Sequence, residues 1–285
     1  MPLSRRVVLS APAIMLARSA WAQDLPVLAD YERQSGGRIG LHAENLKSGK
    51  KIAWRAVERF VMCSTFKASL VACTLSRVDR GKEDLARSIS YGPADLQDFY
   101  APVAKQNLAK GRMTVEEMCE AAVELSDNAC ANLLLASIGG PSVLTDFWRS
   151  TGDFTSRLDH NEPVLNRSRP GDPEDTTTPI AMAGNLRRFL LGNVLSARSR
   201  GRLLSWMIGC RTGANRLRAG LPSTWKIADK TGNNGVDAAG DIAMVWPAPD
   251  APVVICAYTQ GGTPSAPLLE STFRDIGQAV AQSLA

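Results

Sequence analysis

Residues 63–75 read Cys-Ser-Thr-Phe-Lys-Ala-Ser-Leu-Val-Ala-Cys-Thr-Leu and place a hydroxyl and an amine three positions apart at the start of an apolar run. The run contains no Gly or Pro and is longer than a typical strand, so we expect a buried helix that ends near Gly81. Because residues i and i+3 share a helix face, Ser64 and Lys67 can touch. Burial lowers the pKa of an amine, so Lys67 could accept the proton of Ser64. The stretch therefore predicts a serine nucleophile with an attached base.

The same Ser-x-x-Lys spacing also occurs at Ser48-Gly49-Lys50-Lys51. There the glycine lies between two short predicted strands, so we interpret this match as a hairpin turn rather than a catalytic motif. The spacing alone therefore does not identify a site, and the rest of the chain has to support it.

The chain places predicted strands near both ends and helices between them. Strands are predicted at 38–45, 51–55, 225–230, 242–246 and 253–258, and helices at 25–34, nearly throughout 64–138, from 141 onward, and at 179–191, 197–208 and 268–284. Such an order predicts an antiparallel sheet closed by the two ends of the chain, a separate helical lobe and a cleft between them. The polar, proline-containing stretch 157–178 has no clear period, and long loops of this kind are usually functional or disordered.

The first 22 residues have the pattern of an export signal. Arg5 and Arg6 precede a short apolar run, and Ala20-Trp21-Ala22 offers a cleavage site. We predict a twin-arginine signal cut after Ala22, and a periplasmic or secreted protein, with an N-terminal membrane anchor as the weaker alternative. Loss of the three arginines of the signal lowers the formal charge from +5 to +2. That balance argues against nucleic acid as a partner.

The cysteines and histidines exclude several kinds of site. The two histidines, His42 and His160, lack the spacing of a zinc hydrolase or a Ser-His-Asp triad, so we expect no metal and no cofactor. Folding before export takes place in a reducing compartment. We therefore expect mostly free, buried thiols at six scattered positions: Cys63, Cys73, Cys119, Cys130, Cys210 and Cys256.

Two further polar motifs follow the Ser-x-x-Lys stretch. Ser126-Asp127-Asn128 lies between two predicted helices, and Lys230-Thr231-Gly232 follows a predicted strand. Taken alone, the first is typical of a helix N-cap and the second of a turn. Their occurrence together, in this order after Ser64, favours a catalytic site.

With Glu162-Pro163-Val164-Leu165-Asn166, these motifs resemble the class A serine β-lactamases, which belong to the penicillin-recognising serine hydrolases. The resemblance covers nearly the whole chain after residue 22. It implies an α/β fold with a five-stranded antiparallel sheet flanked by helices plus an all-helical lobe. We place the β-lactamase domain at 23–285, with the α/β lobe at about 23–60 and 209–285 and the helical lobe at about 61–208.

The resemblance also implies the chemistry of hydrolysis of a cyclic amide. Ser64 would attack the β-lactam of a penicillin or cephalosporin, and the N–H groups of Ser64 and Asn233 would hold the oxyanion. Glu162 and Asn166 would activate the water that hydrolyses the acyl-enzyme. The remaining residues implied by the family are Lys67, Ser126 and Lys230 for proton transfer and charge, and Asn128, Thr231, Arg216 and Tyr100 for binding substrate.

Some choices stay open at this point. The base for acylation can be Lys67 or Glu162. The alternative functions are a penicillin-binding DD-peptidase that stays acylated, and a covalent β-lactam receptor. The Glu162-x-x-x-Asn166 pattern and the lack of a membrane-spanning run after the signal disfavour both.

In some relatives a cysteine two positions after the Lys-Thr-Gly motif bridges to the cysteine before the nucleophile, here Cys63. That position is Asn234 in this chain, so we expect no such disulfide. We expect a monomer with small-molecule substrates as partners and no stable membrane insertion once the signal is removed.

Overall fold

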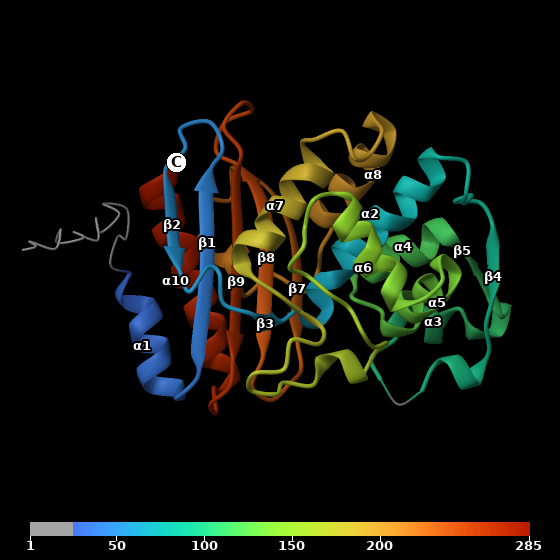
Figure 1. Cartoon of the computed structure of the whole chain (residues 1–285), viewed down its shortest axis with the longest axis horizontal. Coiled ribbons are helices and arrows are strands. Elements are labelled where there is room, and N and C mark those ends of the chain that lie inside the picture. The colour runs from blue at the N-terminus through green and yellow to red at the C-terminus, as the bar shows by residue number, and fades with distance from the viewer. Residues whose placement is uncertain (1–24, 98) are drawn as a thin grey trace, which may run out of the picture.

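The computed structural model describes residues 25–97 and 99–285. The predicted signal and its cleavage site lie outside these residues. One sheet of five strands forms the middle layer (Figure 1). Its strands run antiparallel in the order β2-β1-β9-β8-β7: Lys51–Trp54, Arg38–Asn45, Val253–Gln260, Ala239–Trp246 and Lys226–Asn233. Strands from the N-terminal and C-terminal parts of the chain meet where β1 pairs with β9. The predicted antiparallel sheet is confirmed.

Both faces of this sheet are buried. Successive side chains along a strand point to opposite faces, and on the central strands β8 and β9 the residues on both faces are buried. On β8, Ile242 and Met244 join one hydrophobic cluster, whereas Ala243 and Val245 join the other. Helices α1 (Pro26–Ser35) and α10 (Ala266–Leu284) contribute to the second cluster, and α7 (Pro179–Leu190) packs against β1, β8 and β9 on the opposite face (Figure 1). The result is a three-layer arrangement of helices, sheet and helices.

The helical part is organised around α2 (Phe66–Asp79), which ends close to the predicted boundary at Gly81. Eleven of its residues, Phe66 to Ser76 without interruption, are buried, because other helices cover it on several sides. The helices packed on α2 are α4 (Val115–Glu124), α5 (Asn128–Ile138), α6 (Pro141–Ser150), α7 and α8 (Ala197–Ile208). The lobe boundaries at 61 and 208 stay a prediction, and α7, which falls between them, packs on the sheet as well.

The expectation of almost continuous helix from 64 to 138 is wrong in one place. Residues 80–97 and 99–114 include a small two-stranded sheet of β4 (Ser88–Ser90) and β5 (Arg112–Thr114) instead of a continuous helix. A second small sheet pairs β3 (Phe60–Val61) with β6 (Thr176–Thr177). The remaining short elements are helices α3 (Pro102–Gln106) and α9 (Leu217–Gly220) and 3₁₀ turns at Cys63–Thr65, Pro93–Asp95, Leu108–Lys110 and Val164–Asn166.

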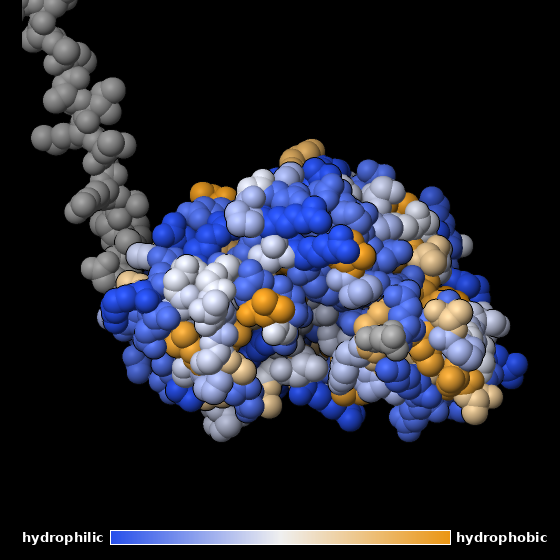
Figure 2. All heavy atoms as spheres, turned by 90° about the horizontal axis from the view of Figure 1, so that it is seen from below, coloured by the Kyte–Doolittle hydropathy of each residue, from blue (hydrophilic) through white to orange (hydrophobic). Residues whose placement is uncertain are grey.

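The surface seen in Figure 2 is mostly hydrophilic, with apolar patches scattered over it. Within the described ranges, no helix is both long and apolar enough to cross a bilayer.

Packing of α7 onto its neighbours supports the fold, and Phe189 tests its contribution. Phe189 is 0% exposed and stacks on Phe147 with 5.5 Å between ring centroids. We expect Phe189→Ala to lower the free energy of unfolding by about 3–5 kcal/mol, because it leaves a cavity. Phe154, which is 77% exposed, provides the matched control; Phe154→Ala should change it by less than about 0.5 kcal/mol. Equal effects in urea titrations would contradict this account of the core.

Candidate active site

Ser64 lies in the 3₁₀ turn Cys63–Thr65, which continues directly into α2. The turn orients the hydroxyl toward the next helical turn, where the Nζ of Lys67 donates to the Ser64 Oγ at 3.0 Å. The contact predicted from the three-residue spacing is therefore present. N–H groups at the start of a helical segment lack partners within it, which leaves the Ser64 N–H available to a substrate oxygen.

Lys67 is fully buried and contacts four segments of the chain. Its Nζ donates to the Ser126 carbonyl at 2.8 Å and to the Oδ1 of Asn128, and lies 3.2 Å from the Oε1 of Glu162. Burial lowers the pKa of this amine, and the attraction of Glu162 opposes the shift without reversing it. Lys67 can therefore give up its proton more readily than an exposed lysine.

Ser126 occupies the turn between α4 and α5 with a positive φ of 58°. Its hydroxyl accepts from the Nζ of Lys230 at 3.0 Å and from that of Lys67 at 3.4 Å. Asp127, next in sequence, caps α5 by accepting from the Cys130 N–H at 2.9 Å. The motif therefore contains a helix cap, at Asp127, beside a hydroxyl placed between two lysines.

Strand β7 supplies Lys230, which is fully buried. Burial lowers the pKa of Lys230 to about 8, and the neighbouring Lys67 cation adds to the shift. Two residues on, a Cβ at Gly232 would lie 2.7 Å from the Ser64 nitrogen. Glycine is required there because the strand packs directly against the turn that carries Ser64.

The loop after α6 delivers Glu162 to the same place. Glu162 is 2% exposed, and its Oε1 accepts from the Ser64 hydroxyl at 3.2 Å. The side-chain amide of Asn166 donates to its Oε2. Asn132 on α5 holds the backbone of Glu162 from the other side, donating to its carbonyl at 3.0 Å and accepting from its N–H at 2.9 Å. Sequence reasoning missed Asn132, although its position four residues after Asn128, on the same helix face, was a usable signal.

The remaining predicted residues surround this centre. Asn128, Asn166 and Asn233 line a cavity of about 640 Å³ together with residues of the loop. Thr231 is on β7, and its hydroxyl contacts the hydroxyl of Thr212. Arg216 is half-buried and donates to the carbonyls of Gly232 and Gly240 at 2.9 Å, so the guanidinium is fixed beside the strand.

Tyr100 is 55% exposed, and its carbonyl accepts from the Asn128 N–H at 3.0 Å. Tyr100 therefore lies at the outer edge of this group of residues.

The six cysteines are free and buried. Burial raises the pKa of the thiol of Cys63. Across residues 25–97 and 99–285, the His, Cys, Asp and Glu side chains form no group that could hold a metal ion.

The site contains a buried serine in contact with a buried lysine, and a carboxylate in contact with both of them. A second serine hydroxyl lies between this lysine and another. These groups define a serine hydrolase that transfers acyl groups without histidine.

Comparison with known proteins specifies the family. The model of the Beta-lactamase enzyme family matches residues 24–284. β-Lactamase CTX-M-25 of Escherichia coli is 44% identical over 255 residues, which cover 90% of this chain and 86% of that protein. An ancestral (GNCA) class A β-lactamase is 49% identical with a TM-score of 0.86, covering 90% of this chain and 97% of that one. A β-lactamase from Xanthomonas campestris is 44% identical with a TM-score of 0.88, covering 91% and 97%. The chain belongs to the class A β-lactamases and hydrolyses β-lactams.

Asn132 is expected to hold the loop in place through the backbone of Glu162. Asn132→Ala leaves a buried N–H and a buried carbonyl without partners, so the free energy of unfolding should fall by about 1–3 kcal/mol for each. The matched control is Asn161→Ala on the exposed residue next to Glu162; it should change stability by less than about 0.5 kcal/mol. Urea unfolding measures both, and a neutral Asn132→Ala would show that other contacts hold the loop.

Proposed function

We propose that this enzyme hydrolyses penicillins and cephalosporins through an acyl-enzyme on Ser64, which water activated by Glu162 then releases. One observation carries the proposal: the Oε1 of Glu162 lies 3.2 Å from both the Ser64 Oγ and the Lys67 Nζ, and all three side chains are buried. A single carboxylate can therefore exchange protons with the nucleophile and with its neighbouring amine.

Acylation begins with attack of the Ser64 Oγ on the β-lactam carbonyl carbon. The serine proton goes to Lys67 or to Glu162; both are in contact with the hydroxyl, and both stay candidates for the base. The N–H groups of Ser64 and Asn233 stabilise the oxyanion. The C–N bond then breaks, and Ser126 passes a proton to the ring nitrogen, drawing on Lys67 or Lys230, both of which contact its hydroxyl.

Deacylation needs a water next to Glu162. Asn166 supports such a water, because its amide N–H₂ already donates to Glu162 while its Oδ1 is buried and has no partner among the described residues. Glu162 takes a proton from the water as the oxygen attacks the ester carbonyl, and Ser64 leaves with that proton returned to it.

The substrate's own charges suit the rest of the cleft. Lys230 and Thr231 lie on β7, and Arg216 lies beside it, where these residues would receive a substrate carboxylate. On the other side, the Oδ1 of Asn128 accepts from Lys67, which leaves its amide N–H₂ for a carbonyl of the substrate side chain. Tyr100 would form the outer wall of the substrate site.

We further propose export by the twin-arginine route to the periplasm or medium. We also propose a monomeric state, since the exposed large apolar side chains are scattered.

Removal of the carboxylate should separate the two half-reactions. We expect Glu162→Gln to lower the deacylation rate constant by about a hundredfold to ten-thousandfold, with the acyl group accumulating on Ser64. Intact-mass spectrometry during turnover of a chromogenic cephalosporin measures this, and Glu120→Gln, at an exposed position on α4, is the matched control. A wild-type protein that stops after one stoichiometric burst would instead be a penicillin-binding peptidase or receptor.

A further inference from the structure

Basic residues are concentrated in one stretch of the chain. Residues 176–228 contain nine Lys and Arg and no Asp or Glu. The chain after residue 22 has a formal charge of only +2, so its remaining residues together carry −7. Helices α7, α8 and α9 lie in the basic stretch. Positive charge is therefore separated from negative charge and belongs to a definite region of the fold.

Four arginines of this stretch have no acidic partner. Arg187 and Arg188 lie in the last turn of α7, and Arg198 and Arg200 lie near the start of α8. Among residues 25–97 and 99–285, no carboxylate oxygen lies within 4.0 Å of their side-chain nitrogens. Arg188 donates to the side-chain carbonyl of Asn185 at 3.3 Å and Arg200 to a backbone carbonyl, so neither charge is neutralised. Arg187 and Arg198 are exposed.

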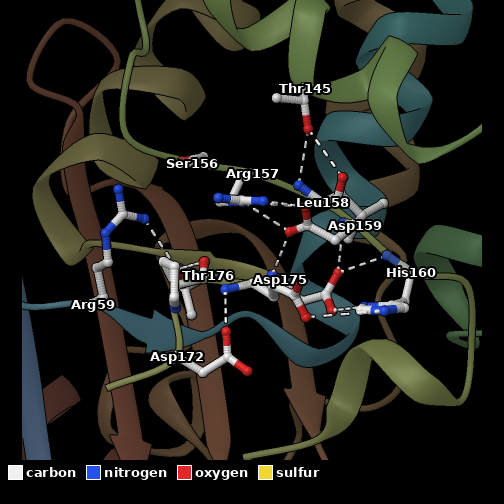
Figure 3. A network of polar contacts seen from close by, with 12 residues as sticks. Arg59, Thr145, Ser156, Arg157, Leu158, Asp159, His160, Asp172, Asp175 and Thr176 are labelled. Atoms are coloured by element: carbon white, nitrogen blue, oxygen red, sulfur yellow. Dashed lines mark hydrogen bonds and ion pairs between the residues drawn. The ribbon is translucent and has the colours of Figure 1, made fainter. Parts of the chain in front are cut away.

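Arginines that hold a loop in place are arranged differently. In the network drawn in Figure 3, Arg157 pairs with Asp159 at 2.5 Å, and Arg59 donates to the Thr176 hydroxyl at 3.0 Å. Helix stability does not explain the four arginines either. Cations in the last turn of α7 suit the dipole of that helix, but cations near the start of α8 oppose it. Their positions therefore favour an anionic partner outside the chain.

The end of α7 lines a cavity of about 670 Å³, which it shares with the turns that follow β1 and β8. Arg200 reaches this cavity from α8, because it donates to the carbonyl of Gly192 in the lining. The lining combines cations with apolar side chains: Arg187, Arg188 and Lys47 with Leu46, Leu191 and Pro252. Such a combination suits a phosphate group attached to an apolar chain.

We call Arg187, Arg188, Arg198 and Arg200, together with Lys47, the arginine surface. Two acids lie beside it. Asp250 pairs with Lys47 at 2.5 Å, and Asp79 accepts from the hydroxyls of Ser196 and Ser199 at 2.7 Å each, at the start of α8. Five basic residues against two acidic ones leave the arginine surface positive.

The arginine surface and the substrate cavity lie at opposite ends of the sheet. Leu46 follows the end of β1, and β7 begins at this same end, where Lys226 pairs with the last residue of β8. Asn233, which lines the substrate cavity, ends β7. A strand of this length spans about 23 Å. In Figure 1 the connection from α7 to α8 lies along the upper edge of the molecule. A partner bound there leaves the cleft accessible.

We propose that the arginine surface docks the enzyme reversibly on the anionic phospholipid headgroups of a membrane. Guanidinium groups bind phosphate oxygens in pairs, and the apolar lining contacts the glycerol region below them. Each arginine near an anionic bilayer strengthens binding about fivefold. No helix has to insert, and the docked enzyme continues to hydrolyse its substrate.

Co-sedimentation of residues 23–285 with lipid vesicles tests the proposal. The vesicles would contain phosphatidylcholine alone or with about one-third phosphatidylglycerol, at ionic strengths from about 0.1 to about 0.5 M. The test variant is Arg187→Gln/Arg198→Gln. The matched control, Arg33→Gln/Arg274→Gln, loses the same net charge from exposed arginines of α1 and α10. Turnover of a chromogenic cephalosporin, with and without vesicles, checks that all three proteins are folded and active.

We expect wild type and control to bind the anionic vesicles, with binding that weakens as salt rises and turnover that stays unchanged. The partition coefficient of Arg187→Gln/Arg198→Gln should be about tenfold to thirtyfold lower. Equal losses in the two double variants would show that net charge alone acts, and would overturn the proposal. So would absence of binding at low salt, or equal binding to phosphatidylcholine alone. Displacement by inorganic phosphate at constant ionic strength would show a site for a free anion in place of a membrane surface.

Discussion

The burial of the Lys67 amine is the constraint on which the rest of the site depends. An uncompensated buried ammonium costs several kcal/mol, so its Nζ needs partners on every side. Ser64, Ser126, Asn128 and Glu162 supply them from the start of α2, the turn before α5, α5 itself and the long loop. The contacts of one buried amine therefore bring together the segments that carry Ser64, Ser126, Asn128 and Glu162. The same desolvation lowers the pKa of the amine, so the requirement that organises the site also makes it reactive.

The sheet completes this arrangement through β7. Strand β7 brings Lys230 to the far side of the Ser126 hydroxyl, and the absence of a side chain at Gly232 lets the strand reach the nucleophile's turn. Two buried lysines on either side of one serine repel each other, which helps to lower the pKa of Lys230. Because β7 pairs with β8 and, through it, with β9 and β1, the position of Lys230 depends on closure of the sheet by both ends of the chain. The three-layer core thus fixes the buried amine of Lys230 beside Ser126.

Much of this could be predicted from local patterns. The contact of Ser64 with Lys67 follows from helical spacing, and the strand pattern at both ends of the chain predicted the sheet. The β4 and β5 pair was missed because each strand has only three residues, too few to show an alternating pattern. Asn132 was missed because its contact with the Glu162 backbone exists only once the loop is folded. His160 is the clearest case: its spacing to His42 argued only against a zinc site or a Ser-His-Asp triad, and its hydrogen-bond partner Asp175, fifteen residues on, comes near only in the folded loop. Arg216 was expected at the substrate carboxylate, and the structure adds that two backbone carbonyls hold it.

The most direct test of the central role of Lys67 is the pKa of its amine in the free enzyme. Nitrogen-15 NMR of lysine-labelled protein would follow the Nζ signal with pH, assigned by its loss in Lys67→Ala. The account predicts a pKa below that of an ordinary lysine, because burial outweighs the attraction of Glu162. A pKa at or above the ordinary value would mean that the amine stays charged throughout, and would contradict its use as a proton carrier for Ser64.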